Sequence, residues 1–261
     1  MPDNNTVYYT DENNDDFAAT NGKIKTKRIG ADYRYIHRDP VWHFFAFILY
    51  RIIATPIAFI FCRVKFGLKI KNRRVLKQIK GGYFLYGNHT QYAADAFIPS
   101  LLSFPRKMMI IVSPDAVSIP GVGSLVPMLG AVPLSASTHG RAHYMEALGK
   151  MVARGHAVTI YPEAHIWPYY NKIRPFNDAS FLYPEYFNVP AVGFTVTYRQ
   201  RRFLSRHIKN LHPHITVTLS EPVYPDDCSS RKEMRDKIYD FMVRTAASEE
   251  SWEYIKYKKS C

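Results

Sequence analysis

A histidine and an aspartate lie six residues apart in the part of the chain best suited to chemistry. His89 follows residues 83–86, an apolar run with the length of a buried strand, and Gly87 ends that run. Asp95 lies within residues 91–98, which have a helical pattern. An imidazole can accept a proton, and a nearby carboxylate can hold its tautomer and stabilise its charged form. The pair predicts a general base and its orienting acid; the alternative is a hydrogen-bonded loop histidine without a chemical role.

A second carboxylate follows another predicted strand. Residues 156–161 (HAVTIY) are mostly apolar, and Pro162 and Glu163 come directly after them. In open α/β sheets, ligands bind beyond the carboxyl ends of the strands, so we expect His89 and Glu163 at the same edge. The alternative for Glu163 is a helix-capping or salt-bridged carboxylate.

The remaining pattern predicts an α/β fold. Further strands are expected at 107–112, 191–198 and 215–220, and helices at 141–154 and after the capping-box residue Ser230. Strands that alternate with helices are typical of a mostly parallel sheet flanked by helices. The chain has 261 residues, enough for one such domain with additional segments.

The composition indicates an anionic partner. The chain has 35 Lys and Arg against 22 Asp and Glu, a formal charge of +13. This charge suits a nucleic acid, an anionic membrane or a phosphorylated substrate. The three cysteines are far apart and form no zinc-finger pattern, which favours a reducing compartment without disulfides. The acidic, polar N-terminus has no pattern of a secretory signal.

Residues 41–62 form a mostly apolar stretch of 22 residues. This length allows a membrane span, but Arg51 is unfavourable in hydrocarbon and Pro56 would kink a helix. We therefore expect two short helices that enter one leaflet, and basic residues on both flanks suit an anionic surface. The alternative is a helical hairpin packed in a soluble core.

Three parts of the chain follow from these patterns. Residues 1–37 are expected to be a flexible polar and basic N-terminus, 38–70 a membrane-associated helical segment, and 71–261 the α/β domain. The expected location is the cytoplasmic face of the cell membrane, as a peripheral or monotopic protein. An arginine cluster is expected to be a membrane-facing or solvated basic patch: Arg199, Arg201, Arg202 and Arg206.

Four motifs occur in order along the chain. GNH with an acid close behind comes first, PMLGAVPLS follows, a strand then ends in TIYPEAH, and NVPAVGFTVTYR comes last. The order and spacing resemble the glycerolipid acyltransferase superfamily, the family of bacterial 1-acylglycerol-3-phosphate acyltransferase, over about residues 80–225. The resemblance implies direct transfer of a fatty acyl group from acyl-CoA or acyl carrier protein to a lysophospholipid hydroxyl. It implies no metal, no cofactor and no covalent acyl-enzyme.

The resemblance also implies roles for individual residues. His89 matches the catalytic base, Asp95 matches the acid that orients it, and Glu163 matches a glutamate implicated in acceptor binding. The spacing between His89 and Asp95 is one residue longer than the family's usual pattern. On an ideal helix one more residue would turn the acid by about 100°, unless a loop or a bulge absorbs it.

The family's phosphate-contacting arginines are missing from their usual places. The second motif has no arginine, and the third reads PEAHIW instead of PEGTR. Arg141, Lys172 and Arg174 are the candidate replacements, and the fork-shaped guanidinium of Arg174 suits a phosphate best.

These patterns together predict a membrane-associated acyltransferase of phospholipid biosynthesis with an acceptor such as lysophosphatidic acid. The missing arginines leave an acceptor without phosphate as one alternative. The longer spacing leaves a catalytically inactive domain that binds membrane lipid as another. A nucleic-acid partner is disfavoured, because the chain has no recognition motif for one.

Overall fold

The computed structural model describes residues 6–17, 25–135, 137–201 and 212–260. The strands are β1 (Thr6–Tyr9), β2 (Lys69–Lys71), β3 (Tyr83–Gly87), β4 (Met108–Val112), β5 (Ala131–Pro133), β6 (Ala157–Ile160), β7 (Ala191–Arg199), β8 (His214–Leu219) and β9 (Lys256–Lys259). The α-helices are α1 (Pro40–Phe47), α2 (Thr55–Phe66), α3 (Val75–Gln78), α4 (Ala94–Ser103), α5 (Thr138–Ala153), α6 (Leu182–Phe187) and α7 (Arg231–Ser248). Residues Ile48–Ala54 form a π-helical stretch, and short 3₁₀ turns lie at Pro114–Val117, Ala179–Phe181 and Pro225–Asp227.

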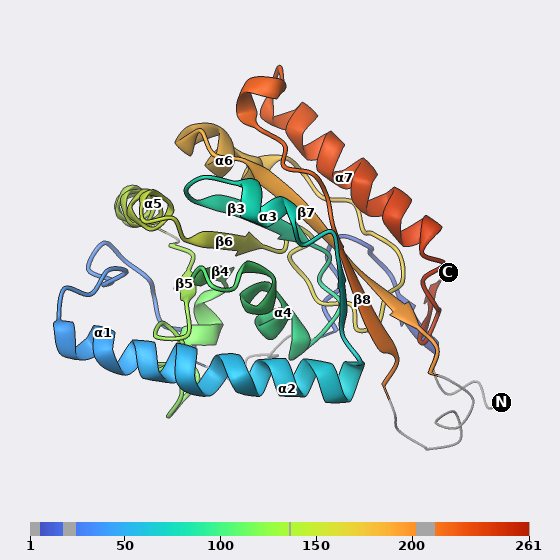
Figure 1. The fold of residues 1–261 in the computed structure, drawn as a ribbon, viewed down its shortest axis with the longest axis horizontal. Coiled ribbons are helices and arrows are strands. Elements are labelled where there is room, and N and C mark those ends of the chain that lie inside the picture. The colour runs from blue at the N-terminus through green and yellow to red at the C-terminus, as the bar shows by residue number, and fades with distance from the viewer. Residues whose placement is uncertain (1–5, 18–24, 136, 202–211, 261) are drawn as a thin grey trace.

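The main sheet has seven strands in the order β2-β8-β7-β3-β6-β4-β5 (Figure 1). Every neighbouring pair is parallel except β7 and β8, which run antiparallel. The predicted α/β class with a mostly parallel sheet is therefore confirmed. The strands β2 and β5 were not predicted, because three residues are too few to show a periodicity.

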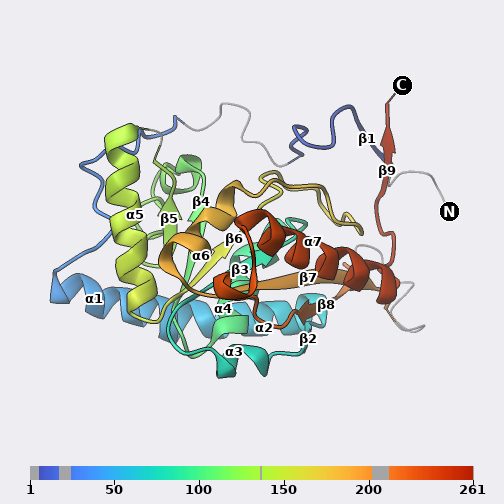
Figure 2. The same cartoon turned by 90° about the horizontal axis from the view of Figure 1, so that it is seen from above.

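The central strand β3 is buried on both faces. Tyr83 and Leu85 join a core that contains residues of α2, α3 and α4, whereas Phe84 and Tyr86 join a second core with residues of α5 and α7. This alternation follows from the two-residue period of a strand. Figures 1 and 2 show the two helical layers on opposite sides of the sheet. A strand covered on both faces must be apolar throughout, which is why the sequence alone revealed β3.

Helices α1 and α2 form one continuous rod from Pro40 to Phe66, in contrast to the two short helices expected. The π-helical stretch joins them, and the N–H of Thr55 donates to the carbonyl of Tyr50 five residues earlier. The wider π turn shifts the hydrogen-bond register just before Pro56, so the helix continues past the proline instead of breaking there. The rod is long and apolar enough to cross a membrane.

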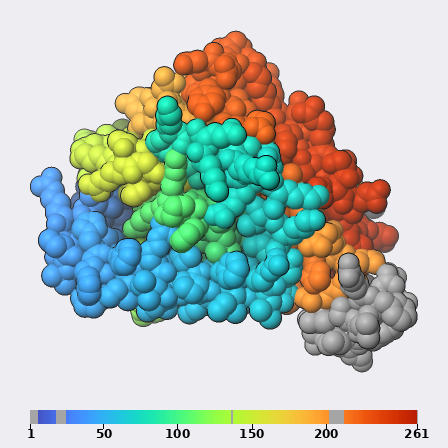
Figure 3. Space-filling model, viewed as in Figure 1, coloured from blue at the N-terminus to red at the C-terminus, as the bar shows by residue number. Residues whose placement is uncertain are grey.

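Only one side of the rod packs against the domain. Its buried residues are Ala46, Tyr50, Ala58, Cys62 and Phe66. The other side carries large apolar residues that remain exposed: Val41, Phe44, Phe45, Phe47, Ile52, Ile53, Ile57, Phe59, Ile60 and Val64. Figure 3 shows the rod as a continuous ridge along one edge of the molecule.

Candidate active site

His89 and Asp95 form a hydrogen-bonded pair just beyond the carboxyl end of β3. His89 Nδ1 and Asp95 Oδ2 are 2.8 Å apart. Residues 88–93 are not helical, and α4 begins only at Ala94. The additional residue between His89 and Asp95 therefore lies in the loop before α4. It does not rotate Asp95 away from the His89 ring, as it would inside an ideal helix.

Asp95 is buried and held by three hydrogen bonds. Its Oδ2 also accepts from the backbone N–H of Gln91 at 2.8 Å, and its backbone carbonyl accepts from the Tyr161 hydroxyl at 2.6 Å. Burial raises the pKa of Asp95 above its ordinary value, while His89 and the Gln91 N–H act in the opposite direction. These donors stabilise the carboxylate form, which is the form that accepts a hydrogen bond from the Nδ1–H of His89.

The His89 ring lies between protein groups that fix its plane. Tyr161 stacks on it with centroids 4.4 Å apart and planes 14° apart. A carboxylate can only accept, so the neutral ring carries its proton on Nδ1 and leaves the lone pair on Nε2. Among the residues that the structure describes, none forms a hydrogen bond with Nε2, and 18% of the side chain is exposed. The ring is thus positioned to accept a proton from a molecule outside the protein.

Asn88 connects this turn to the neighbouring strand. Its side-chain oxygen accepts from the N–H of Val196 at 2.7 Å, and its amide donates to the carbonyl of the same residue at 3.0 Å. The two bonds tie the end of β3 to β7 and thereby hold His89 at the edge of the sheet.

Glu163 lies near His89, as predicted, but it forms a buried ion pair with Arg174. Its Oε2 accepts from the backbone N–H of His89 at 3.2 Å and lies 3.3 Å from Arg174 Nη2. The same guanidinium donates to the carbonyls of Glu163 and His165. Burial raises the pKa of Glu163, and the charge of Arg174 opposes this shift.

Arg174, the arginine that the sequence favours as a phosphate ligand, lies inside the protein. Only 1% of the residue is exposed, and its hydrogen bonds go to groups of the protein. Glu163 is 4% exposed and likewise bound to the protein rather than open to an acceptor. Both residues hold the loop after β6 against the His89 turn, so we interpret them as positioning residues.

Residues 6–17, expected to be flexible, pack against this loop. Strand β1 pairs in parallel with β9, and Arg174 Nη1 donates to the carbonyl of Glu12 at 3.2 Å. Trp167 is completely buried, and its Nε1 donates to the carbonyl of Asp15 at 2.8 Å. The sequence could not show this strap, because its residues are mostly polar and their partners lie about 150 positions away. The expected division of the chain into domains stays a prediction.

The other two candidate phosphate ligands lie elsewhere. Lys172 is exposed in the loop after β6, and Arg141 is exposed in the first turn of α5. Within the described residues, neither side chain forms a hydrogen bond with the candidate site residues His89, Asp95, Glu163 and Arg174. Of the arginine cluster, Arg199 and Arg201 are partly buried and donate to Thr216, Gly67, Ile215, His212 and Lys65. Arg202 and Arg206 lie outside the described residues.

A family model for acyltransferases matches residues 67–196, which include His89, Asp95, Glu163 and Arg174. Among solved structures, the chain is similar to the crystal structure of PlsC, the 1-acyl-sn-glycerophosphate (LPA) acyltransferase from Thermotoga maritima. The two share 17% identity at a TM-score of 0.53, over 81% of this chain and 95% of that chain, which supports a common fold. None of the curated protein sequences matches the chain. The family match, the PlsC-like fold and the order of the motifs agree, and together they support the glycerolipid acyltransferase superfamily as the family of this chain.

Proposed function

We propose that this acyltransferase moves a fatty acyl group from an acyl thioester to a hydroxyl of a lysophospholipid such as lysophosphatidic acid. The observation that carries this proposal is the His89 Nδ1–Asp95 Oδ2 contact of 2.8 Å, which leaves Nε2 without a partner among the described residues. The donor is acyl-CoA or acyl carrier protein. Like the family it resembles, the protein would use no metal or other cofactor.

The reaction that we propose is a direct transfer. His89 Nε2 takes the proton of the acceptor hydroxyl while the oxygen attacks the thioester carbonyl. The Asp95 carboxylate stabilises the imidazolium that forms. The carbon–sulfur bond then breaks, the imidazolium returns the proton to the thiolate, and an ester and a free thiol leave.

The acceptor's head group has a second candidate. The burial of Arg174 removes the guanidinium that the sequence favoured for a phosphate, which favours a hydroxyl acceptor without phosphate. Arg141 and Lys172 remain the exposed candidates for a phosphate. Replacing each with glutamine should raise the KM only for phosphorylated acceptors, if either residue binds the phosphate.

We further propose a monotopic protein at the cytoplasmic face of an anionic membrane, and the exposed apolar side of the α1–α2 rod supports the membrane contact. An exposed side with ten large apolar residues marks an interaction surface on a protein. Arg51, which is unfavourable in hydrocarbon, donates to the carbonyl of Pro105 and lies 5.1 Å from the Phe104 ring centroid. This contact draws the charge toward the domain and leaves the opposite side of the rod apolar.

Replacing Phe44, Ile52 and Phe59 with serine is expected to weaken binding to anionic vesicles. Each side chain would contribute about 1.5–3 kcal/mol if fully buried in lipid, so the triple variant should bind at least about tenfold more weakly. The measurement is co-sedimentation with vesicles of phosphatidylglycerol and phosphatidylcholine. Substitution is a cleaner test than deletion of the rod, which would also remove Cys62 and Phe66 from the core.

The matched control replaces three exposed apolar residues on α6 and α7, on the other side of the sheet: Leu182, Tyr186 and Val243. This control should bind vesicles as the unaltered protein does. Equal losses in the two triple variants would contradict a membrane-binding role for the rod.

Release of free thiol tests the proposed function. The purified protein is mixed with palmitoyl-CoA or palmitoyl acyl carrier protein, with and without lysophosphatidic acid. We expect thiol release that depends on the acceptor. Release only with acceptors that lack phosphate would establish the second candidate. The absence of release with every acceptor and donor would reject the enzymatic proposal in favour of a lipid-binding domain.

A further inference from the structure

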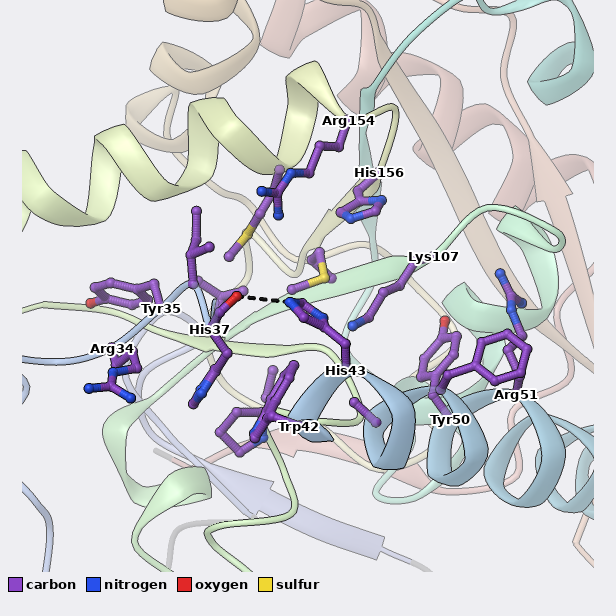
Figure 4. Close-up of a pocket in the computed structure, with 18 of the residues that line it drawn as sticks. Arg34, Tyr35, His37, Trp42, His43, Tyr50, Arg51, Lys107, Arg154 and His156 are labelled. Carbon is purple, nitrogen blue, oxygen red and sulfur yellow. Dashed lines mark hydrogen bonds between the residues drawn. The ribbon is translucent and has the colours of Figure 1, made fainter. Parts of the chain in front are cut away.

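A cavity lies at the amino ends of the strands, the opposite end of the sheet from His89. It has a volume of about 390 Å³ and lies between α1, the beginnings of β4 and β6, and the end of α5 (Figure 4). Lys107 and His156 line it and immediately precede β4 and β6, whereas His89 follows the carboxyl end of β3. Because these strands are parallel, the cavity and the candidate active site are separated by the length of the sheet.

The lining is rich in positive charge. It contains four arginine and lysine residues and three histidines, with no aspartate or glutamate: Arg34, Arg51, Lys107, Arg154, His37, His43 and His156. Figure 4 shows Arg154 and His156, from the turn between α5 and β6, and Lys107, which precedes β4, beside the same space. Among the described residues, none of these side chains forms a salt bridge. The ring centroids of Tyr50 and Trp42 lie 5.8 and 5.9 Å from the Lys107 ammonium.

The charges in the cavity influence each other. Burial, Lys107 and Arg154 together lower the pKa of His156 to about 4. Burial and the charge of Arg51 lower the pKa of Lys107. Unpaired cations that repel each other in a partly buried space are stabilised when an anion enters it.

The cavity also has apolar walls next to the exposed side of the rod. Trp42, Ala46, Phe47, Met109 and Met151 line it, and 58% of Phe47 is exposed. Pockets that bind small molecules combine a mostly apolar lining with a few convergent polar groups. A ligand with an anionic head and an apolar tail therefore matches both the cations and the neighbouring membrane-facing surface.

We propose that this cavity binds the phosphate group of an anionic ligand, as the head group of an acidic phospholipid presents it. Arginine forms paired hydrogen bonds with phosphate oxygens, and lysine adds a point charge, so Arg154 and Lys107 are its principal ligands. The site is separate from the acyl-transfer site and does not require the function proposed above. A soluble phosphate compound presents the same chemistry, and the experiment distinguishes the two sources.

The experiment is a calorimetric titration of the detergent-solubilised full chain with three probes. Dihexanoyl phosphatidylglycerol presents an anionic lipid head group, dihexanoyl phosphatidylcholine a zwitterionic one, and inorganic phosphate the group alone. No acyl donor is present, so the result does not depend on catalysis. NMR signals of the His156 ring provide a second readout that is confined to the cavity.

Two single variants, Lys107→Gln and Arg154→Gln, remove one cation each. Each should bind phosphatidylglycerol at least about tenfold more weakly, which is the effect of one lost charge-assisted hydrogen bond. The matched controls are Lys77→Gln and Lys80→Gln, because both lysines are exposed and neither lines the cavity. Thermal melting followed by circular dichroism shows that each variant is folded, and Arg154 is an exposed residue whose loss leaves the core intact.

The outcomes separate clearly. Binding of phosphatidylglycerol but neither phosphatidylcholine nor inorganic phosphate supports the lipid head group, and comparable binding of inorganic phosphate supports a soluble ligand. In both cases the His156 signals shift, and the His89→Ala protein retains the affinity. The proposal is overturned if no anionic probe binds, if phosphatidylcholine binds equally well, or if both cavity variants bind like the controls.

Discussion

Replacing His89 with alanine is expected to lower acyl transfer by about 10²–10⁴-fold, the usual contribution of a positioned general base. The substitution removes the Nε2 lone pair that accepts the hydroxyl proton. Among the described residues, the other group that donates to Asp95 Oδ2 is the backbone N–H of Gln91, which cannot accept a proton. The measurement is acceptor-dependent thiol release under saturating donor. The fold should persist, because the ring lies at the edge of the sheet and is not part of either core.

Two further variants make this result specific. Asp95→Asn keeps the His89 ring but replaces the carboxylate with an amide, so it should lower the rate while melting at a similar temperature. His139→Ala removes an exposed histidine from α5 and should leave the rate unchanged. A folded His89→Ala protein with undiminished transfer would refute the general-base mechanism.

Replacing Arg174 with methionine is expected to lower the free energy of unfolding by about 3–5 kcal/mol, as for other buried ion pairs that lose one partner. The substitution leaves the Glu163 carboxylate buried, with only two backbone N–H donors. It also removes the hydrogen bond to the Glu12 carbonyl and the contact with the Trp167 ring, whose centroid is 5.0 Å away. Urea denaturation followed by circular dichroism measures the change.

The double variant Arg174→Met, Glu163→Gln separates the uncompensated charge from the other lost contacts. It should be more stable than Arg174→Met alone, because the neutral amide costs less to bury than a carboxylate. Arg244→Met serves as the control, since Arg244 is exposed on α7 and its loss should change stability little. If Arg174→Met were as stable as this control, the ion pair would have no structural role.

The sequence by itself determined the elements whose signal is local. The apolar run of β3, the strands β4, β6, β7 and β8, and the helical periodicity of α5 each depend on residues within a few positions of one another. The motif around His89 and Asp95 is local in the same sense. These patterns suffice for the α/β class, because a strand buried on both faces and an amphipathic helix each have a characteristic period.

Only the tertiary structure decided how the parts meet. Asp95 can form a hydrogen bond with His89 at the six-residue spacing because α4 begins only at Ala94. Arg174 became a candidate for a structural role, rather than for phosphate binding, because it forms a buried ion pair with Glu163. The strap of residues 6–17 and the cationic cavity likewise arise from contacts between distant segments. Such contacts leave no periodic pattern in the chain, because burial and charge pairing depend on neighbours in space and not on neighbours in sequence.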